Sequence, residues 1–103
     1  MKQTLNQIVQ HFRIGILTMD EVIIRTKLRE FITRELIRDE DYELTDTEGI
    51  ITEGLMDSFA LAEFAVYVEG EFDVYIPDAD LTVEKMDTLD LMVARVLYEL
   101  QKE

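Results

Sequence analysis

The sequence predicts an all-α fold, a four-helix bundle of three main helices and one short helix, with a long loop after the first main helix. One proline and four glycines in 103 residues favour long, uninterrupted elements. Apolar residues recur at spacings of three and four along much of the chain, which is the helical period. A chain of this length forms one domain with a modest core, and its 48% hydrophobic and 32% charged residues are typical of a globular protein.

The first residues predict a short amphipathic segment that ends near Gly15. Its apolar positions fall on one helix face, and they are Leu5, Ile8, Val9 and Phe12. We expect residues 1–18 to be an N-terminal extension, either disordered or folded as a short extra helix. Residues 19–103 are expected to form the main domain.

The first main helix is predicted to begin at a capping box, in which Thr18 and Glu21 satisfy the free amides of the first turn. It continues to about Arg38. Its inward positions share one face and are Ile24, Leu28, Phe31, Ile32 and Leu36.

Residues 38–54 predict a long acidic loop, since their apolar residues are scattered and two glycines interrupt them. A loop of this length in a small domain is usually functional or is held by its own apolar residues. The candidate anchors are Leu44, Ile50 and Leu55.

The second main helix is predicted from Asp57 to Phe72, because an apolar stripe runs along it at helical spacing. The members of that stripe are Leu61, Phe64, Ala65, Val68 and Phe72. An extended link follows, because the residue before Pro77 is excluded from the helical region.

Two further helices complete the prediction. Asp78 or Asp80 caps a short helix that ends near Met86, and Asp87 or Thr88 caps the last helix. The inward positions of the last helix are Leu89, Met92, Val93, Val96 and Leu100. We interpret Met56, Met86 and Met92 as adaptable core residues.

The charge is unevenly distributed along the chain. Residues 1–38 contain seven Lys/Arg and four Asp/Glu, a net charge of +3, whereas residues 39–103 contain three Lys/Arg and nineteen Asp/Glu, a net charge of −16. A field of this sign repels phosphate backbones and attracts basic protein surfaces, which argues against nucleic-acid binding. We expect no membrane span and a cytoplasmic location, because the N-terminal apolar run is short and interrupted.

The residues do not predict an enzyme or a metal site. There is no cysteine and only one histidine, His11, so a nucleophilic serine would lack a nearby base. An acidic loop that starts at Asp39 fails as a calcium loop, because Leu44 and Ile50 occupy the positions that need Gly and a bidentate Glu. A loop that starts at Asp73 fails because Tyr75 and Asp78 occupy its third and sixth positions. Taken alone, Asp57 and Ser58 have an ordinary interpretation as helix-capping residues.

The surroundings of Ser58 resemble those of the acyl carrier protein family. The sequence EGLMDSF at residues 53–59 is similar to the attachment motif of that family, and the acidic turn with Phe72 and the Ile-Pro at 76–77 follow at family positions. Thr88 at the last helix and the anchors Leu44 and Ile50 extend the resemblance over about residues 20–100. Gly54 lies three residues before Asp57, where many carriers have Gly two residues before, and Phe59 follows where many have Leu. This variant resembles free-standing D-alanyl or aminoacyl carriers and some dedicated acyl carriers.

The resemblance implies a carrier fold and a covalent 4′-phosphopantetheine on Ser58, next to Asp57, which holds an acyl or aminoacyl group as a thioester. It implies a monomer whose partners are a phosphopantetheinyl transferase, an acyl- or aminoacyl-activating ligase and acyl-transfer enzymes. The expected partner surface consists of Phe59, Glu63, Val66, Glu69 and Met86.

Two other classes of function remain open. A non-carrier helical adaptor would bind a basic protein through the same acidic second helix and would not be modified. A hydrolase is the third class, and it would need a base near Ser58.

Overall fold

The computed structural model describes residues 13–102, with side chains from Glu21 onward, and this part of the chain is helical without strands. The main helices are α2 (Arg13–Phe31), α3 (Ser58–Phe72) and α5 (Leu89–Gln101). A π-helical extension, η1 (Ile32–Ile37), continues α2. The short elements η2 (Asp78–Asp80) and α4 (Val83–Met86) lie between α3 and α5.

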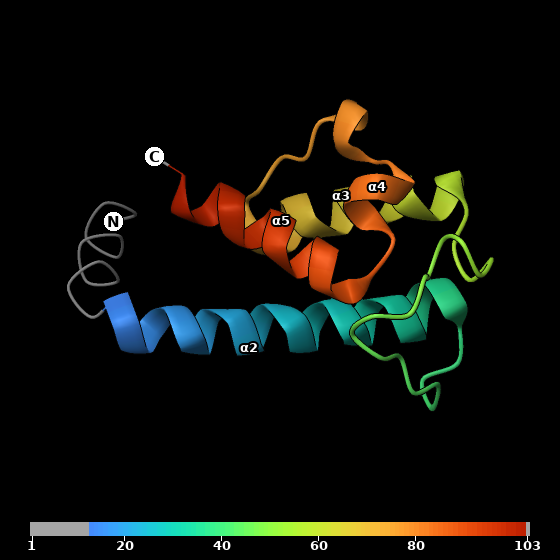
Figure 1. The fold of residues 1–103 in the computed structure, drawn as a ribbon, viewed down its shortest axis with the longest axis horizontal. Coiled ribbons are helices and arrows are strands. Elements are labelled where there is room, and N and C mark those ends of the chain that lie inside the picture. The colour runs from blue at the N-terminus through green and yellow to red at the C-terminus, as the bar shows by residue number, and fades with distance from the viewer. Residues whose placement is uncertain (1–12, 103) are drawn as a thin grey trace.

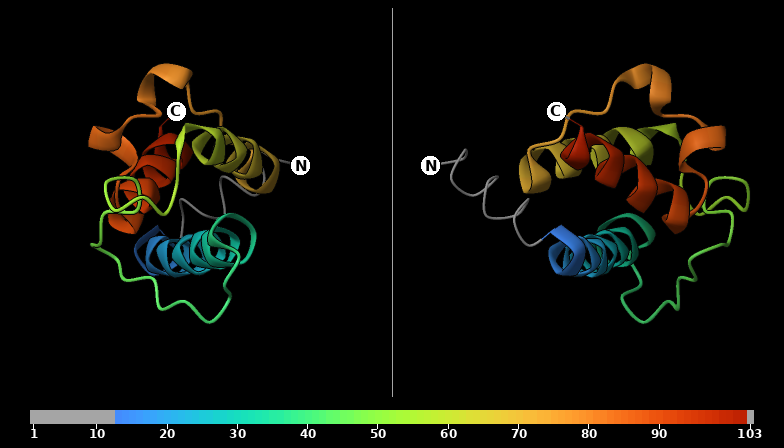
Figure 2. Two further views of the ribbon diagram at one scale, coloured as in Figure 1. Left: turned by 90° about the vertical axis from the view of Figure 1, so that its right-hand side faces the viewer. Right: turned by 60° about the vertical axis from the view of Figure 1, so that its left-hand side comes forward.

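Helix α2 runs along one long edge of the molecule. Helices α3 and α5 lie together on the side of α2 that faces the rest of the molecule (Figure 1). Viewed from the end, the three main helices surround a common centre, and the connection from η1 to α3 passes around one end of them (Figure 2). Phe31 of α2 stacks on Tyr67 of α3 with ring centroids 4.0 Å apart. Lys27 pairs with Glu71 at 2.9 Å, which joins the same two helices.

The core receives apolar side chains from every main helix and from the connections between them. It comprises Ile24, Leu28, Ile32, Leu44, Ile50, Met56, Leu61, Phe64, Val68, Val74, Ile76, Met86, Leu89, Met92, Val93 and Val96. The interpretation of Met56, Met86 and Met92 as core residues is confirmed. The loop anchors Leu44 and Ile50 are confirmed as buried, and Leu55 is half-buried against them.

The predicted helix start at Thr18 is wrong, because α2 is continuous from Arg13 and passes through both Gly15 and Thr18. A capping box requires an extended residue at its first position, whereas Thr18 already lies within the helix. The boundary expected between residues 18 and 19 therefore falls inside α2. The predicted segment with Leu5, Ile8, Val9 and Phe12 lies outside the described residues.

The later helix starts are partly as predicted. Thr88 caps α5, and its side chain accepts from the Leu91 amide. Thr82, and neither Asp78 nor Asp80, caps α4. Leu100 was expected to face the core but is 44% exposed, since the buried positions of α5 end at Val96.

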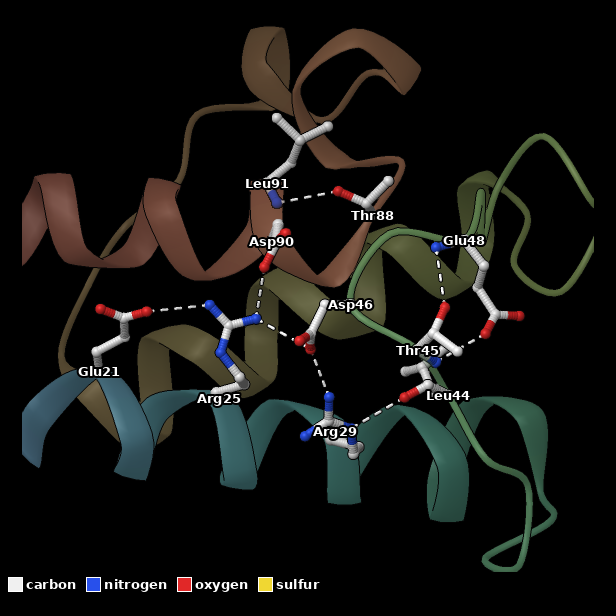
Figure 3. A network of polar contacts seen from close by, with 10 residues as sticks. All are labelled: Glu21, Arg25, Arg29, Leu44, Thr45, Asp46, Glu48, Thr88, Asp90 and Leu91. Atoms are coloured by element: carbon white, nitrogen blue, oxygen red, sulfur yellow. Dashed lines mark hydrogen bonds and ion pairs between the residues drawn. The ribbon is translucent and has the colours of Figure 1, made fainter.

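Ion pairs hold the long loop against the helices (Figure 3). Arg25 of α2 pairs with Asp46 of the loop at 3.0 Å and with Asp90 of α5 at 2.6 Å. Arg29 also pairs with Asp46, and its Nε donates to the Leu44 carbonyl at 3.1 Å. These bonds bring the loop, α2 and α5 together at one point. The loop is thus fixed at Leu44 and Asp46, well before it reaches α3.

The loop also stabilises its own conformation. The Thr45 amide donates to Glu48 and the Glu48 amide donates to the Thr45 hydroxyl, in a reciprocal pair. The Tyr42 hydroxyl donates to Glu48 at 2.6 Å. This bond, together with those from Thr45, lowers the pKa of Glu48 below its ordinary value despite the opposing effect of burial.

None of the helices in the described part of the chain is long and apolar enough to span a membrane.

Candidate functional site

The start of α3 carries both predicted site residues, and they have different roles. Asp57 is the N-cap, with extended backbone angles, and its carboxylate accepts from the Ala60 amide at 2.8 Å. Ser58 is the first helical residue and is exposed. Its hydroxyl forms no hydrogen bond with any described residue. The predicted cap at Asp57 is confirmed, and Ser58 is not needed for it.

The segment that leads to Ser58, residues 49–56, is a compact turn that we call the approach segment. The carbonyl of Ile50 accepts from the amides of Leu55 and Met56 at 2.9 and 3.1 Å. Gly54 has a φ of +83°, which a side chain would disfavour. Met56 is buried, so the chain is fixed in the core just before it emerges at Asp57.

Asp87, at the end of α4, binds the approach segment directly. Its Oδ1 accepts from the amides of Ile51 and Thr52 at 2.8 and 3.0 Å, and its Oδ2 accepts from the Thr52 hydroxyl at 3.0 Å. Burial acts to raise the pKa of Asp87, but the hydrogen bonds from Thr52 and Ile51 outweigh it and lower that pKa. The sequence predicted Asp87 only as a candidate cap for α5.

Four of the five predicted partner residues lie on the exposed surface of α3, and we call them the outer face. They are Phe59, Glu63, Val66 and Glu69. Phe59 is 75% exposed and Val66 is 71% exposed, and they have the largest exposed fractions among the large apolar side chains of the described residues. The prediction that Met86 belongs to this surface is wrong, because Met86 is the last residue of α4 and its side chain is fully buried in the core.

The outer face is acidic as well as apolar. Helix α3 contains no Lys or Arg. Glu71 pairs with Lys27 across the bundle, whereas Glu63 and Glu69 have no ion-pair partner among the described residues. The exposed aromatic and aliphatic side chains therefore lie within a negative field.

A groove of about 210 Å³ lies between α3 and the chain that returns from it toward α4. Its walls are Ala62, Ala65, Val66 and Glu69 of α3 and, from the returning chain, Tyr75, Ile76, Asp78 and Leu81. Ala62 follows Ser58 by four residues, so both lie on one helix face. The groove thus begins one turn from the Ser58 hydroxyl. Its volume is below the 300–1,000 Å³ or so of typical small-molecule sites, which limits it to a narrow ligand.

The described residues provide no catalytic base for Ser58. They include no histidine, because His11 lies outside the described residues. From residue 21 to residue 102, no cluster of acidic side chains is arranged to hold a metal ion.

When the sequence is compared with known protein families and with curated proteins, nothing matches it. The functional proposal therefore depends on the residues themselves, which are the EGLMDSF motif, the exposed Ser58 hydroxyl, the outer face and the groove.

Proposed function

We propose that this protein is a carrier protein in which Ser58 bears a 4′-phosphopantetheine arm. The thiol of that arm holds an acyl or aminoacyl group as a thioester. The observation that carries the proposal is the Ser58 hydroxyl, which is exposed at the start of α3 and is left without a structural bond because Asp57 caps the helix. Ser58 is also the only serine in the chain.

The start of α3 suits an attached phosphodiester. The amide of Ala60 is used by Asp57, whereas the amides of Ser58 and Phe59 have no acceptor among the described residues. Free amides and the positive end of the helix dipole favour an anion at this place. The negative charge of a phosphodiester on Ser58 therefore needs no basic side chain from this protein.

The groove supports the proposal in a second way. A flexible chain attached to Ser58 reaches it within one helical turn, because Ala62 forms its near end. Its apolar walls, Ala62, Ala65 and Ile76, suit the aliphatic part of such an arm or a short acyl group. The arm supplies the thiol that this cysteine-free chain lacks.

The outer face suits the partners of a carrier. A transferase or a ligase with a basic surface is attracted by Glu63 and Glu69, and Phe59 and Val66 give apolar contacts beside Ser58. Charges at the rim of an interface act mainly on the rate of encounter, so partners still dissociate readily. A carrier requires such exchange, because it meets several enzymes in turn.

A second candidate function is a non-carrier adaptor that binds a basic protein through the outer face. The exposure of Phe59 and Val66 favours it, because an interaction surface of this kind does not depend on Ser58. The two candidates differ in whether Ser58 is modified.

Incubation with a broad-specificity phosphopantetheinyl transferase, coenzyme A and magnesium, followed by intact mass spectrometry, separates them. The carrier proposal expects a gain of one phosphopantetheine group, and its loss in the Ser58→Ala variant. An unchanged mass, in a reaction where a known carrier is modified, favours the adaptor and contradicts the carrier proposal.

A further inference from the structure

Asp87 directs all of its side-chain bonds to the approach segment. Its carboxylate accepts three hydrogen bonds, from the amides of Ile51 and Thr52 and from the Thr52 hydroxyl, and its carbonyl accepts from the Ile50 amide at 2.7 Å. It has no ion-pair partner among the described residues, and Thr88 caps α5 in its place. Its carboxylate is therefore committed to this one segment, 35 or 36 residues away in sequence.

The bonds continue from Asp87 to the start of α3. Ile50, whose amide donates to Asp87, uses its carbonyl to accept from the amides of Leu55 and Met56. Met56 is buried and directly precedes Asp57, the cap of α3. The position of the Ser58 backbone relative to α4 and α5 is thus set through Asp87.

Gly49 gives independent evidence that this contact is close. A Cβ atom at Gly49 would lie 2.0 Å from the Thr52 hydroxyl oxygen and 3.0 Å from Asp87 Oδ2. A side chain there would displace one of the two groups that bind each other. The contact between Thr52 and Asp87 therefore fits beside position 49 only when that residue is glycine.

We propose that Asp87 is a positioning residue for the modification of Ser58, and that it acts by holding the approach segment in place. Because positioning matters only if Ser58 is modified, this inference rests on the proposed function. The proposed docking residues Phe59 and Glu63 lie on α3, and the side-chain hydrogen bonds of Asp87 go to Ile51 and Thr52 instead. Loss of the Asp87 carboxylate leaves transferase binding in place and misaligns the Ser58 hydroxyl.

The inference predicts a specific change in the kinetics of the transferase reaction. In Asp87→Ala, kcat falls by about 10- to 100-fold, since a displacement of about 1 Å from a reactive geometry has an effect of that order. The KM for the carrier changes little. Asp87→Asn retains an oxygen for the two amides and a group that binds the Thr52 hydroxyl, so it restores most of kcat.

Asp80→Asn is the matched control. Asp80 binds Lys85 and Arg95, on α4 and α5, at 2.6 and 2.7 Å, and it does not touch the approach segment. This variant loses polar contacts in the same part of the fold, and it is expected to keep the kcat of the unaltered protein. Circular dichroism establishes a temperature at which all variants are folded, and the kinetics are measured there.

Hydrogen exchange at the amides of Ile51 and Thr52 reports the contact directly, and these amides are expected to exchange faster in Asp87→Ala. If Asp87→Ala does not fold, Thr52→Val removes only the bond to Oδ2 and is expected to lower kcat by a smaller factor. The inference is overturned if Asp87→Ala, or Thr52→Val in its place, keeps an unaltered kcat, or if Asp80→Asn loses as much. If the unaltered protein is not modified at all, the proposed function fails first, and the inference fails with it.

Discussion

Helices α3 and α5 both begin beside a hydroxyl side chain, and the two hydroxyls differ in what they bind. Thr88 is the N-cap of α5, and its hydroxyl accepts from the Leu91 amide at 3.1 Å. Ser58 is one residue inside α3, where the carboxylate of Asp57 has taken the equivalent bond from Ala60. The same chemical group is structural in one helix, whereas in the other it binds none of the described residues.

This difference separates a residue that the fold needs from one that it does not. At α5, removal of the hydroxyl leaves a helix amide without its acceptor. At α3, the amide remains satisfied and the fold loses no bond. An exposed hydroxyl without a structural partner is available for covalent modification, which supports the proposal for Ser58.

The largest loss of unfolding free energy is expected from Ile50→Ala, because Ile50 lies between the two helix starts and its side chain packs in the core. Its side chain is fully buried, its amide donates to Asp87 beside α5, and its carbonyl holds the residues before α3. Replacing a buried Ile by Ala costs about 2–5 kcal/mol of unfolding free energy. Urea denaturation followed by circular dichroism measures this cost.

Ile50→Val is the control, because it keeps the backbone and most of the side chain and is expected to lose about 0.5–1.5 kcal/mol. Equal stability of Ile50→Ala and Ile50→Val would show that the packing of the Ile50 side chain does not stabilise the region between the two helix starts.

Removal of either cap is expected to cause the next largest loss of unfolding free energy. Asp57→Ala and Thr88→Ala each leave one amide of the first turn without its acceptor, and each is expected to lose about 1 kcal/mol. The two free energies are measured by the same denaturation experiment. A stable Thr88→Ala variant would contradict the assignment of its hydroxyl as the cap of α5.

Ser58→Ala is expected to change the unfolding free energy by no more than about 0.5 kcal/mol, as at other surface positions. The hydroxyl has no hydrogen bond with any described residue, and alanine is a good helix former. A loss as large as that of Thr88→Ala would mean that Ser58 also has a structural role.

The smallest change of unfolding free energy is expected from acidification, which weakens the contact between Asp87 and the approach segment. The pKa of Asp87 is lowered in the folded protein, so its ionised form adds stability above the unfolded pKa of about 3.9. That contribution is lost as the pH falls through the folded pKa. The difference in unfolding free energy between the unaltered protein and Asp87→Asn should therefore shrink below about pH 3.9. A difference that stays constant with pH would contradict the assignment.

Local patterns were sufficient to predict several elements. The helix at Ser58–Phe72 and its cap were predictable, because one apolar stripe and one favoured capping residue coincide there. The burial of Leu44 and Ile50 was also predictable, since few other apolar residues are available in an acidic loop.

The remaining features depend on contacts between distant segments. The bonds of Asp87 join residues that are far apart in sequence, so no local pattern reveals them. The groove exists because Tyr75 and Ile76 return alongside α3. Met86 was assigned to both the core and the surface, and only the packing of α4 shows that it is buried. Thr18 has the pattern of a cap, but the residues before it are already helical.

We propose that the Ser58 hydroxyl, which binds none of the described residues, carries the phosphopantetheine arm. The most direct test is the intact mass of three proteins after one transferase reaction with coenzyme A and magnesium. They are the unaltered chain, Ser58→Ala and Thr88→Ala. The unaltered chain and Thr88→Ala are each expected to gain one phosphopantetheine group, and Ser58→Ala is expected to gain none. A gain of mass in Ser58→Ala, or no gain in the unaltered chain beside a reference carrier that is modified, would contradict the proposal.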